Sequence, residues 1–236
     1  QKANPKHAIL VRSVNRGLNS GDYDALTECG FKPMFARNVL LFPFKPIETY
    51  PRVKRRQILR DEHLGRKLGF TWRSGVKLDE EQAARVADLY NRLYLGKYSK
   101  NNPRFTPLFH AQCASRSILH YQLLLDGDHI IGVLGMKVVD GVATMPVLGY
   151  DFDHPQAHVL YRILTAKIAR TCSDNNFQRH ASSGANKFKK LRGGVTNEEF
   201  TMVKTSHLSW WRRLNWGIIR FIAQKIGRPL THKFET

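Results

Sequence analysis

Two short stretches of this sequence combine side chains that could donate protons, accept protons or bind anions. Tyr150, Asp151 and His154 follow an apolar segment and offer a hydroxyl donor and two groups that could accept a proton. The second stretch joins small polar residues to cations, and its members are Ser182, Ser183, Gly184, Lys187, Lys189, Lys190 and Arg192. Each residue also has a plainer interpretation: a tyrosine at the rim of a core, a histidine that caps a loop, an ordinary strand end, or a solvated basic helix face.

The elements expected around these stretches would bring them to one crevice. Residues 142–150 read as a strand, apolar residues over 159–169 follow helical spacing, and a second strand follows that helix. A strand, a crossover helix and a parallel strand place the loop after the first strand beside the end of the second, where ligands of open α/β sheets bind. We therefore expect the loop at 150–154 and the segment 182–190 to face one polar, strongly positive crevice.

An antiparallel meander is expected before this unit. Asp126-Gly127 and Asp140-Gly141 supply tight turns between strand-like runs. A basic helix is expected at 53–68, either as a solvated face or as a wall for a phosphate-bearing ligand. The sequence begins at Gln1 without a methionine, so the question whether an N-terminal segment precedes it stays open.

The composition is that of a globular protein with an unusual charge. Its 236 residues, 42% hydrophobic and 24% charged, can form one large domain or two small ones. The 38 basic and 19 acidic residues give a net charge of +19, which favours a polyanionic partner. Isolated cysteines indicate free thiols in a reducing compartment, and no residue spacing indicates a metal site. No apolar run reaches the roughly 18 residues that a membrane-spanning helix needs, and we expect a cytoplasmic protein.

The end of the chain, 209–227, is expected to form an amphipathic helix. Its apolar face would hold Trp211, Leu214, Ile218, Phe221 and Ile222, with arginines on another face. Packing of the apolar face against the sheet is the preferred interpretation. The alternative is peripheral membrane contact, because tryptophan and arginine at this density also suit a lipid headgroup region.

The order of elements and three short motifs resemble the GNAT N-acyltransferase fold, and more narrowly the branch of the FemABX aminoacyl transferases and BioF2-type acyltransferases. The motifs are the basic run Arg55–Arg60 before Gly69, the hairpin Leu123–Gly135, and Phe188-Lys189 between Gly184 and Gly193. The resemblance covers nearly the whole chain as an order of elements. It implies an α/β fold with a mixed sheet, in which an antiparallel meander is followed by a βαβ crossover.

The resemblance also implies three segments along the chain. Residues 1–50 would be a remnant of a first GNAT-like half, 51–206 the acyltransferase domain, and 207–236 a C-terminal amphipathic helix and tail. The implied activity is transfer of an acyl group from a thioester, acyl carrier protein or acyl-coenzyme A, to an amine of a peptide or small molecule, without a tightly bound cofactor.

The candidate residues can be given roles in such a transfer. Lys189 would contact a phosphate or the developing oxyanion, because the family carries a lysine at this place. Tyr150 would donate to the intermediate or the leaving group, and Asp151 or His154 would take the proton of the amine. The remaining candidates would bind the donor, and they are Ser182, Ser183, Gly184, Lys187, Lys190 and Arg192.

One departure from the family changes the expected donor. Coenzyme-A-dependent members carry a glycine-containing pyrophosphate loop before the crossover helix, whereas residues 151–157 here read Asp-Phe-Asp-His-Pro-Gln-Ala. Without glycines the backbone wraps a pyrophosphate less easily at a helix N-terminus. This leaves room for acyl carrier protein or for charged tRNA in a FemABX-like reaction. A non-enzymatic nucleic-acid-binding protein is a further alternative, although no recognition module is present and the basic residues are not interleaved with stacking aromatics.

Overall fold

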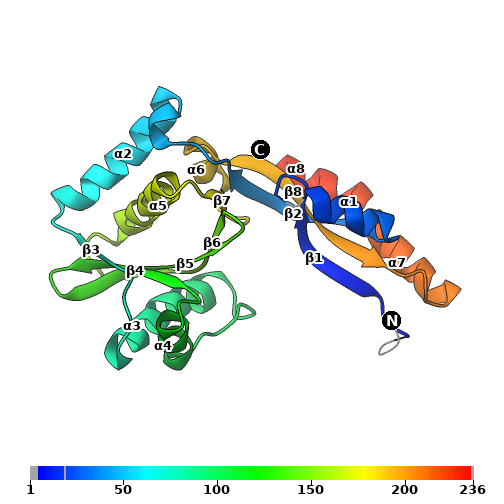
Figure 1. Ribbon diagram of the computed structural model, residues 1–236, viewed down its shortest axis with the longest axis horizontal. Helices are drawn as coiled ribbons and strands as arrows, with labels where there is room; N and C mark the ends of the chain where they lie inside the picture. Colours follow the sequence, from blue (N-terminus) through cyan, green and yellow to red (C-terminus); the bar gives the residue numbers. More distant parts are fainter. Residues whose placement is uncertain (1–4, 19, 235–236) are drawn as a thin grey trace. The chain divides into compact units, whose positions relative to one another are not determined.

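The computed structural model describes residues 5–18 and 20–234 (Figure 1). The chain divides into two compact units. The central unit runs from Pro43 to His180, and the terminal unit joins Gln1–Phe42 to Ala181–Thr236. The three-segment division predicted from the sequence stays a prediction, because compactness alone does not test it. No helix in the described part of the chain is both long enough and apolar enough to cross a membrane.

The central unit contains a mixed sheet with the strand order β7-β6-β5-β4-β3. Its strands are β3 (Thr71–Ser74), β4 (His120–Asp126), β5 (His129–Val139), β6 (Val142–Tyr150) and β7 (Gln178–His180). The neighbours from β3 to β6 are antiparallel, and β7 is parallel to β6. Gly127 and Gly141 have φ angles of 57° and 75°, as the tight turns require. The meander and the crossover predicted from the sequence are therefore confirmed.

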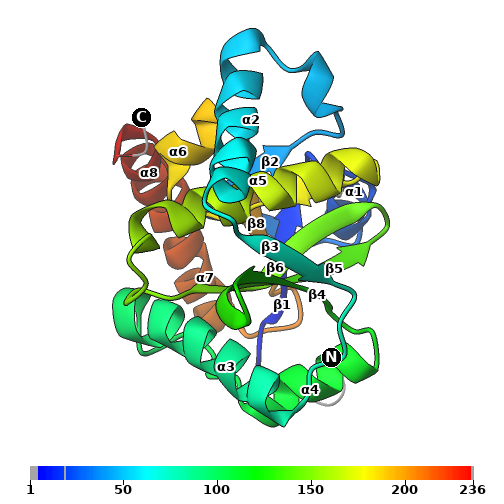
Figure 2. The same ribbon diagram turned by 90° about the vertical axis from the view of Figure 1, so that its left-hand side faces the viewer.

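Helices cover both faces of the central sheet (Figures 1 and 2). The helices on one face are α2 (Arg52–Lys67) and α5 (Ala157–Asp174), with the short 3₁₀ turn η1 (Ile47–Thr49) preceding α2. Those on the other face are α3 (Glu80–Asn91), its π-helical continuation η2 (Arg92–Tyr98), and α4 (Pro107–Ser115). Each face has its own apolar core, so the sheet is the middle layer of a three-layer unit.

The crossover helix α5 is held by the apolar stripe that the sequence predicts. Leu160, Ile163 and Leu164 are almost fully buried in the core against the sheet. Ala166, farther around the helix, packs with Ile47 and Ile58, which join α5 to η1 and α2. The stripe is broad because α5 contacts the sheet on one side and another helix on the next.

Helix α3 lies unusually close to β6. Its N-cap is Asp79, whose side chain accepts a hydrogen bond of 2.8 Å from the Gln82 N–H. A Cβ atom on Gly149 of β6 would lie 2.6 Å from the Leu89 carbonyl carbon and 2.8 Å from the Tyr90 nitrogen. These are backbone atoms, so only glycine permits this approach of the helix to the strand.

The terminal unit contains an antiparallel sheet with the order β1-β8-β2. Its strands are β1 (Ile9–Asn15), β2 (Lys32–Phe42) and β8 (Val195–Lys204). Its helices are α1 (Ser20–Glu28), α6 (Asn186–Leu191), α7 (Trp210–Ile222), the π-helical η3 (Ala223–Gly227) and α8 (Arg228–Phe234). A small core of Val14, Tyr23 and Met202 joins α1 to the sheet.

Candidate functional site

Strand β6 continues past the end of its parallel neighbour. Residues 142–144 of β6 lie opposite 178–180 of β7, and β7 ends there. Within the central unit, Met145–Tyr150 therefore have a strand partner on the β5 side alone. Such a half-paired strand offers backbone N–H and C=O groups to an extended ligand.

A β-bulge lies where this open edge begins. Lys137 of β5 is opposite Thr144, and Gly135 is opposite Val147, so β6 carries one residue more than β5 over this interval. Pro146 lies within the bulge. Proline has no N–H to give to a ladder, and in sheets it occurs at edges and bulges. The proline therefore marks, in the sequence, the place where β6 loses one neighbour.

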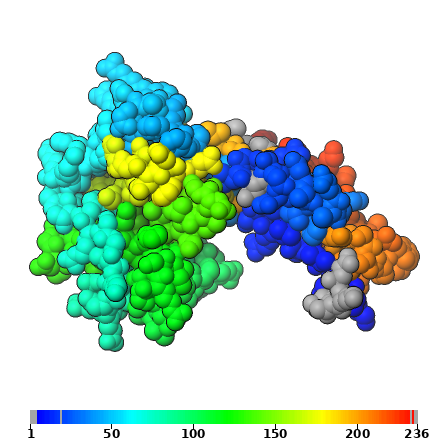
Figure 3. All heavy atoms as spheres, viewed as in Figure 1, coloured from blue at the N-terminus to red at the C-terminus, as the bar shows by residue number. Residues whose placement is uncertain are grey.

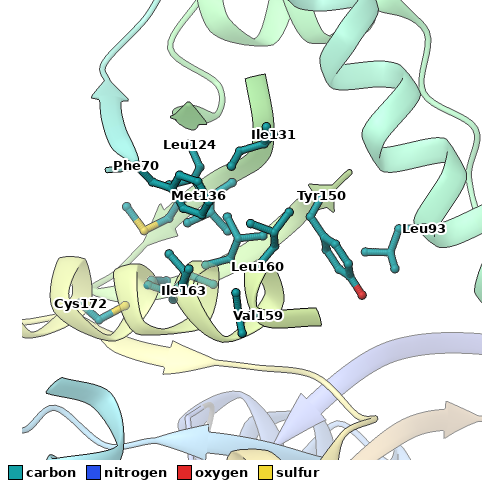
Figure 4. Close-up of a cluster of buried hydrophobic side chains, with 14 residues drawn as sticks. Phe70, Leu93, Leu124, Ile131, Met136, Tyr150, Val159, Leu160, Ile163 and Cys172 are labelled. Atoms are coloured by element: carbon teal, nitrogen blue, oxygen red, sulfur yellow. The ribbon is translucent and has the colours of Figure 1, made fainter. Parts of the chain in front are cut away.

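Tyr150 closes β6 at the rim of the core between the sheet and α5. Its ring centroid lies 4.7 Å from that of Phe152 and 6.3 Å from that of Tyr161, and the residue is 8% exposed. Figure 4 shows the ring of Tyr150 between Leu93 and Leu160. Packing against the rings of Phe152 and Tyr161 thus fixes the orientation of the Tyr150 side chain.

Asp151 is held by charged and backbone donors. Its Oδ2 accepts a hydrogen bond of 2.6 Å from Arg85, its Oδ1 accepts one of 2.9 Å from the Asp153 N–H, and Arg92 lies 3.6 Å from Oδ1. Burial raises the pKa of Asp151, but the Asp153 N–H and the two guanidinium groups outweigh it and hold this pKa below its usual value. A carboxylate bonded in this way fixes its loop and is a poor acceptor for the proton of an amine.

His154 is also committed to contacts within the protein. Its Nδ1 accepts a hydrogen bond of 3.1 Å from the Gln156 N–H, so the proton of the neutral ring lies on Nε2. Nε2 is 3.1 Å from the Asp126 carboxylate in the β4–β5 turn. The ring stands edge-on to Phe70, with the centroids 5.6 Å apart. The structure therefore shows His154 as a tie between the loop and the turn, as the loop-capping interpretation predicts.

A cavity of about 530 Å³ opens beside this loop. Its acidic lining residues are Asp79, Glu81, Asp126, Asp128, Asp151 and Asp153, and its basic ones are Arg73, Arg85, His129 and His154. This cavity is therefore lined mainly by acidic residues, and it includes none of the residues 182–190 that were expected to make the crevice positive. The reason is that Asp126 and Asp128 of a turn, and acidic residues that suit a helix N-terminus, converge on the same loop.

Lys189 is buried in α6 and binds carbonyl groups of the same unit. It is 7% exposed, and its ammonium group donates hydrogen bonds of 2.6 Å to the Ala181 oxygen and 3.0 Å to the Ser183 oxygen. These carbonyls belong to the segment that leads into α6. Lys189 therefore positions this segment, a role that differs from the phosphate or oxyanion contact expected from the resemblance.

The segment that Lys189 holds has an unusual backbone. Ser182, Gly184 and Ala185 have φ angles of 55°, 82° and 49°. A left-handed conformation is unfavourable for serine and alanine, and it persists where the surrounding structure holds it in place. The two hydrogen bonds from Lys189 to the Ala181 and Ser183 oxygens hold this backbone in place. Such strained segments occur preferentially at ligand sites.

The other cations of this stretch differ in exposure. Lys187 is exposed and Lys190 is half-buried. Arg192 is 7% exposed, and its guanidinium lies 3.6 Å from the centroid of the Phe188 ring, a cation–π contact. Lys187 is thus the cation of this group with the most access to a ligand in solvent.

The predicted site residues fall into two groups. Asp151 and His154 line one cavity, and Tyr150 packs on the α5 side of the sheet. Ser182, Ser183, Gly184 and the cations belong to the terminal unit. A crevice shared by the two groups stays a prediction. Among the described residues, no cluster of His, Cys, Asp and Glu has the arrangement to hold a metal ion.

Two arginines that bond the loop after β6 were not identified from the sequence. Arg85 and Arg92 fasten the loop after β6, because Arg92 also donates a hydrogen bond of 2.7 Å to Asp153. They are seven residues apart along α3 and η2, which places them on one side of the helix. This spacing could have indicated that the two arginines lie on one side of the helix. It could not indicate their partners, because the carboxylates lie some sixty residues later in the chain.

Comparison with known proteins shows the fold. No family model matches the chain, and no curated protein matches its sequence. Among solved structures, L-PGS from Bacillus licheniformis matches with a TM-score of 0.62 at 10% identity, over 92% of this chain and 73% of that one. FemX matches with a TM-score of 0.58 at 11% identity, over 85% of this chain and 73% of that one.

A third solved structure also matches the chain. It is the C-terminal DUF2156 domain of a putative lysylphosphatidylglycerol synthetase from Agrobacterium fabrum, with a TM-score of 0.59 at 12% identity, over 84% of this chain and 68% of that one. Identities this low establish the fold alone. The GNAT-like, FemABX-related fold predicted from the sequence is thereby confirmed.

Proposed function

We propose that the protein is an acyltransferase that takes an aminoacyl group from the ester of a charged tRNA and transfers it to an amine. The fold supports the reaction class, since the sequence motifs resemble the FemABX aminoacyl transferases and the structure matches FemX. A thioester donor, acyl-coenzyme A or acyl carrier protein, is the competing proposal.

The observation that carries the choice of donor is the loop before α5. The helix begins at Ala157, and its N-cap residue Gln156 makes no side-chain cap. The preceding residues hold two carboxylates, Asp151 and Asp153, which Arg85 and Arg92 tie to α3. The diphosphate of coenzyme A would meet like charges there, and no glycine allows the backbone to wrap it. A donor without a diphosphate at this position fits better.

The positive charge of the chain supports a tRNA donor. The net charge is +19, and helix α2 carries a row of cations along its outer side. Arg52, Arg56 and Arg60 line a hollow of about 300 Å³ on that helix. Cations arranged along one exposed helix bind a phosphate backbone and speed its encounter with the protein.

The transfer needs few groups from the protein. The amine nitrogen attacks the ester carbonyl, a C–N bond forms, the ester C–O bond breaks, and the proton of the amine ends on the ribose oxygen. The open edge of β6 offers N–H groups for the carbonyl oxygen. The hydroxyl of Tyr150, the last residue of that strand, is the proposed proton donor to the leaving oxygen.

A comparison of donors tests the proposal. Aminoacyl-tRNA, acyl-coenzyme A and acyl carrier protein are each incubated with the full chain and a panel of amines, and the amide products are followed by mass spectrometry. We expect amine-dependent product from aminoacyl-tRNA. Free thiol and product from either thioester, with none from tRNA, would replace the proposal by its competitor. Binding of tRNA with a steep salt dependence and no turnover would identify a binding protein instead.

A further inference from the structure

The helix near the C-terminus has its apolar side turned away from its own sheet. Helix α7 contains no buried residue. Its large apolar side chains on one side form what we term the apolar stripe: Trp210, Trp211, Leu214, Ile218, Phe221 and Ile222. These side chains are between 47% and 62% exposed. In Figure 3 the atoms of α7, in orange, lie at the outer surface of the terminal unit.

The side of the helix that does contact the sheet is a different one. Trp216, Ala223 and Gln224 are half-buried, and Gln224 donates a hydrogen bond of 3.1 Å to the Pro33 oxygen of β2. At about 100° per residue Trp216 and Ala223 lie opposite the middle of the apolar stripe. The sequence-based preference, in which the apolar face packs on the sheet, is therefore wrong. The helix is anchored by its less apolar side, and the apolar stripe lacks a partner among the described residues.

The charges around the apolar stripe have one sign. From Leu208 to Phe234 the sequence contains no Asp or Glu. Arg213 and Lys225 are exposed and Arg220 is half-buried, and none of them forms an ion pair with a described residue. Arg228, in contrast, is paired with Glu198 at 2.5 Å and belongs to the fold. The cations that flank the stripe are thus available to an anionic partner.

The ends of the stripe suit the boundary between lipid and water. The rings of Trp210 and Trp211 stack with their centroids 3.7 Å apart at the N-terminal end of α7. Tryptophan is enriched in the headgroup layer, where one side of the ring meets hydrocarbon and the N–H meets water. At the other end Ile226 and Leu230 continue the exposed apolar surface into η3 and α8.

We propose that α7 docks the protein on the surface of an anionic phospholipid bilayer. The apolar stripe enters the boundary between headgroups and acyl chains, and Arg213, Arg220 and Lys225 contact lipid phosphates. Three features together favour a bilayer over another protein: a continuous exposed apolar stripe, cations without acidic residues, and a stacked tryptophan pair. The proposal is independent of the donor used in the transfer reaction.

Sedimentation with vesicles tests this surface. The full chain is mixed with vesicles of phosphatidylcholine alone or with phosphatidylserine added, and the bound fraction is measured at several salt concentrations. We expect binding to the mixed vesicles that weakens with salt. The double variant Trp211→Ser/Phe221→Ser should bind at least tenfold more weakly, although its net charge is unchanged. Arg213→Gln and Lys225→Gln should each weaken binding about fivefold.

The control separates this stripe from exposed apolar residues in general. Leu108 in α4 is 66% exposed, and Leu108→Ser should bind as the wild type does. Equal binding by the wild type and the double variant would overturn the proposal, because attraction by overall charge would then suffice. A second result would also overturn it: neither protein binds vesicles, and light scattering shows a concentration-dependent dimer of the wild type that the double variant does not form. A second copy of the chain would then cover the apolar stripe.

Discussion

The ammonium group of Lys189 lies 2.6 Å from the carbonyl oxygen of Ala181, eight residues earlier in the chain. The family resemblance assigns this lysine to the substrate, whereas the structure shows it holding the segment before α6. The two roles differ in what a substitution does. Removal of a side chain that only contacts substrate leaves the stability of the fold unchanged. Removal of a buried donor that bonds two carbonyl groups lowers that stability.

We expect Lys189→Met to lower the free energy of unfolding by about 1–3 kcal/mol, because the Ala181 and Ser183 oxygens lose a charged donor. Urea denaturation measures the change. Lys187→Met is the matched control, since Lys187 is exposed in the same helix and should change stability by less than about 0.5 kcal/mol. If Lys189→Met abolished turnover and left stability intact, the positioning role would be refuted.

The Arg85–Asp151 pair should couple the loop after β6 to α3. Both side chains are less than one-third exposed, and Arg85 lies 2.6 Å from the Asp151 carboxylate. We therefore expect a double-mutant cycle of Arg85→Met and Asp151→Asn to give an interaction energy of about 0.5–2 kcal/mol. Arg104→Met, at an exposed arginine of the same unit, is the control. An interaction energy near zero would show that the loop is held by other contacts.

The same pair predicts the sign of a pH effect. Because the folded pKa of Asp151 lies below its usual value of 3.8, the carboxylate stabilises the folded state at neutral pH. This contribution is present above the pKa of the unfolded chain and is lost as the pH falls through the lower folded pKa. Asp151→Asn should therefore flatten the loss of stability in the interval between the unfolded and the lower folded pKa of Asp151, as followed by urea denaturation at a series of pH values.

Gly149→Ala should destabilise the central unit by about 2–4 kcal/mol, because its Cβ would fall within 2.6–2.8 Å of backbone atoms of Leu89 and Tyr90. Neither a rotamer change nor a small side-chain shift relieves a clash with the backbone. Gly96→Ala is the control in the same unit, since a Cβ there has no atom within 4 Å. Thermal unfolding of the two variants compares them directly, and similar melting temperatures would contradict the close approach of α3 to β6.

His110 should make the protein sensitive to mild acid. It is fully buried among aromatic rings, its Nδ1 lies 2.8 Å from the Tyr121 hydroxyl, and its Nε2 has no hydrogen-bond partner among the described residues. Burial lowers the pKa of His110 from 6.5 to about 4. Between these values the unfolded chain binds a proton that the folded chain does not, so stability falls as the pH drops from 6.5 toward 4.

The loss from His110 is on the order of 3 kcal/mol over that window. The double variant His110→Phe/Tyr121→Phe replaces both polar partners by apolar groups of similar shape and should remove this part of the pH dependence. Denaturation curves at neutral pH and near pH 4.5 provide the measurement. An unchanged slope of stability against pH in the double variant would show that other groups cause the acid sensitivity.

Much of the central unit could be predicted from the sequence because its signals are local. Asp126-Gly127 and Asp140-Gly141 define the meander, and the stripe on α5 defines the crossover helix. The direction in which α7 turns its apolar side could not be predicted. Periodicity reveals that a helix has an apolar face, and it does not reveal whether the protein or its surroundings cover that face.

For the candidate site, the sequence indicated polar residues but not the partners that they bond. Asp151 and His154 line a cavity, but Asp151 is bonded to Arg85 and His154 to Asp126. Both partners are distant in sequence. The burial of Lys189 was likewise hidden, since a basic run of this kind usually marks a solvated helix face. Pro146 stands within the strand-like run at 142–150. Its location in a bulge of β6, just past the last residue that pairs with β7, became evident from the strand register.

The central claim is that the acyl donor is an ester of tRNA and that the acidic loop before α5 excludes coenzyme A. The most direct measurement is the rate at which the full chain releases uncharged tRNA from aminoacyl-tRNA when an amine acceptor is present, with acyl-coenzyme A added as a competitor. We predict amine-dependent release that acyl-coenzyme A does not slow. Release that acyl-coenzyme A inhibits while free thiol accumulates would contradict the account.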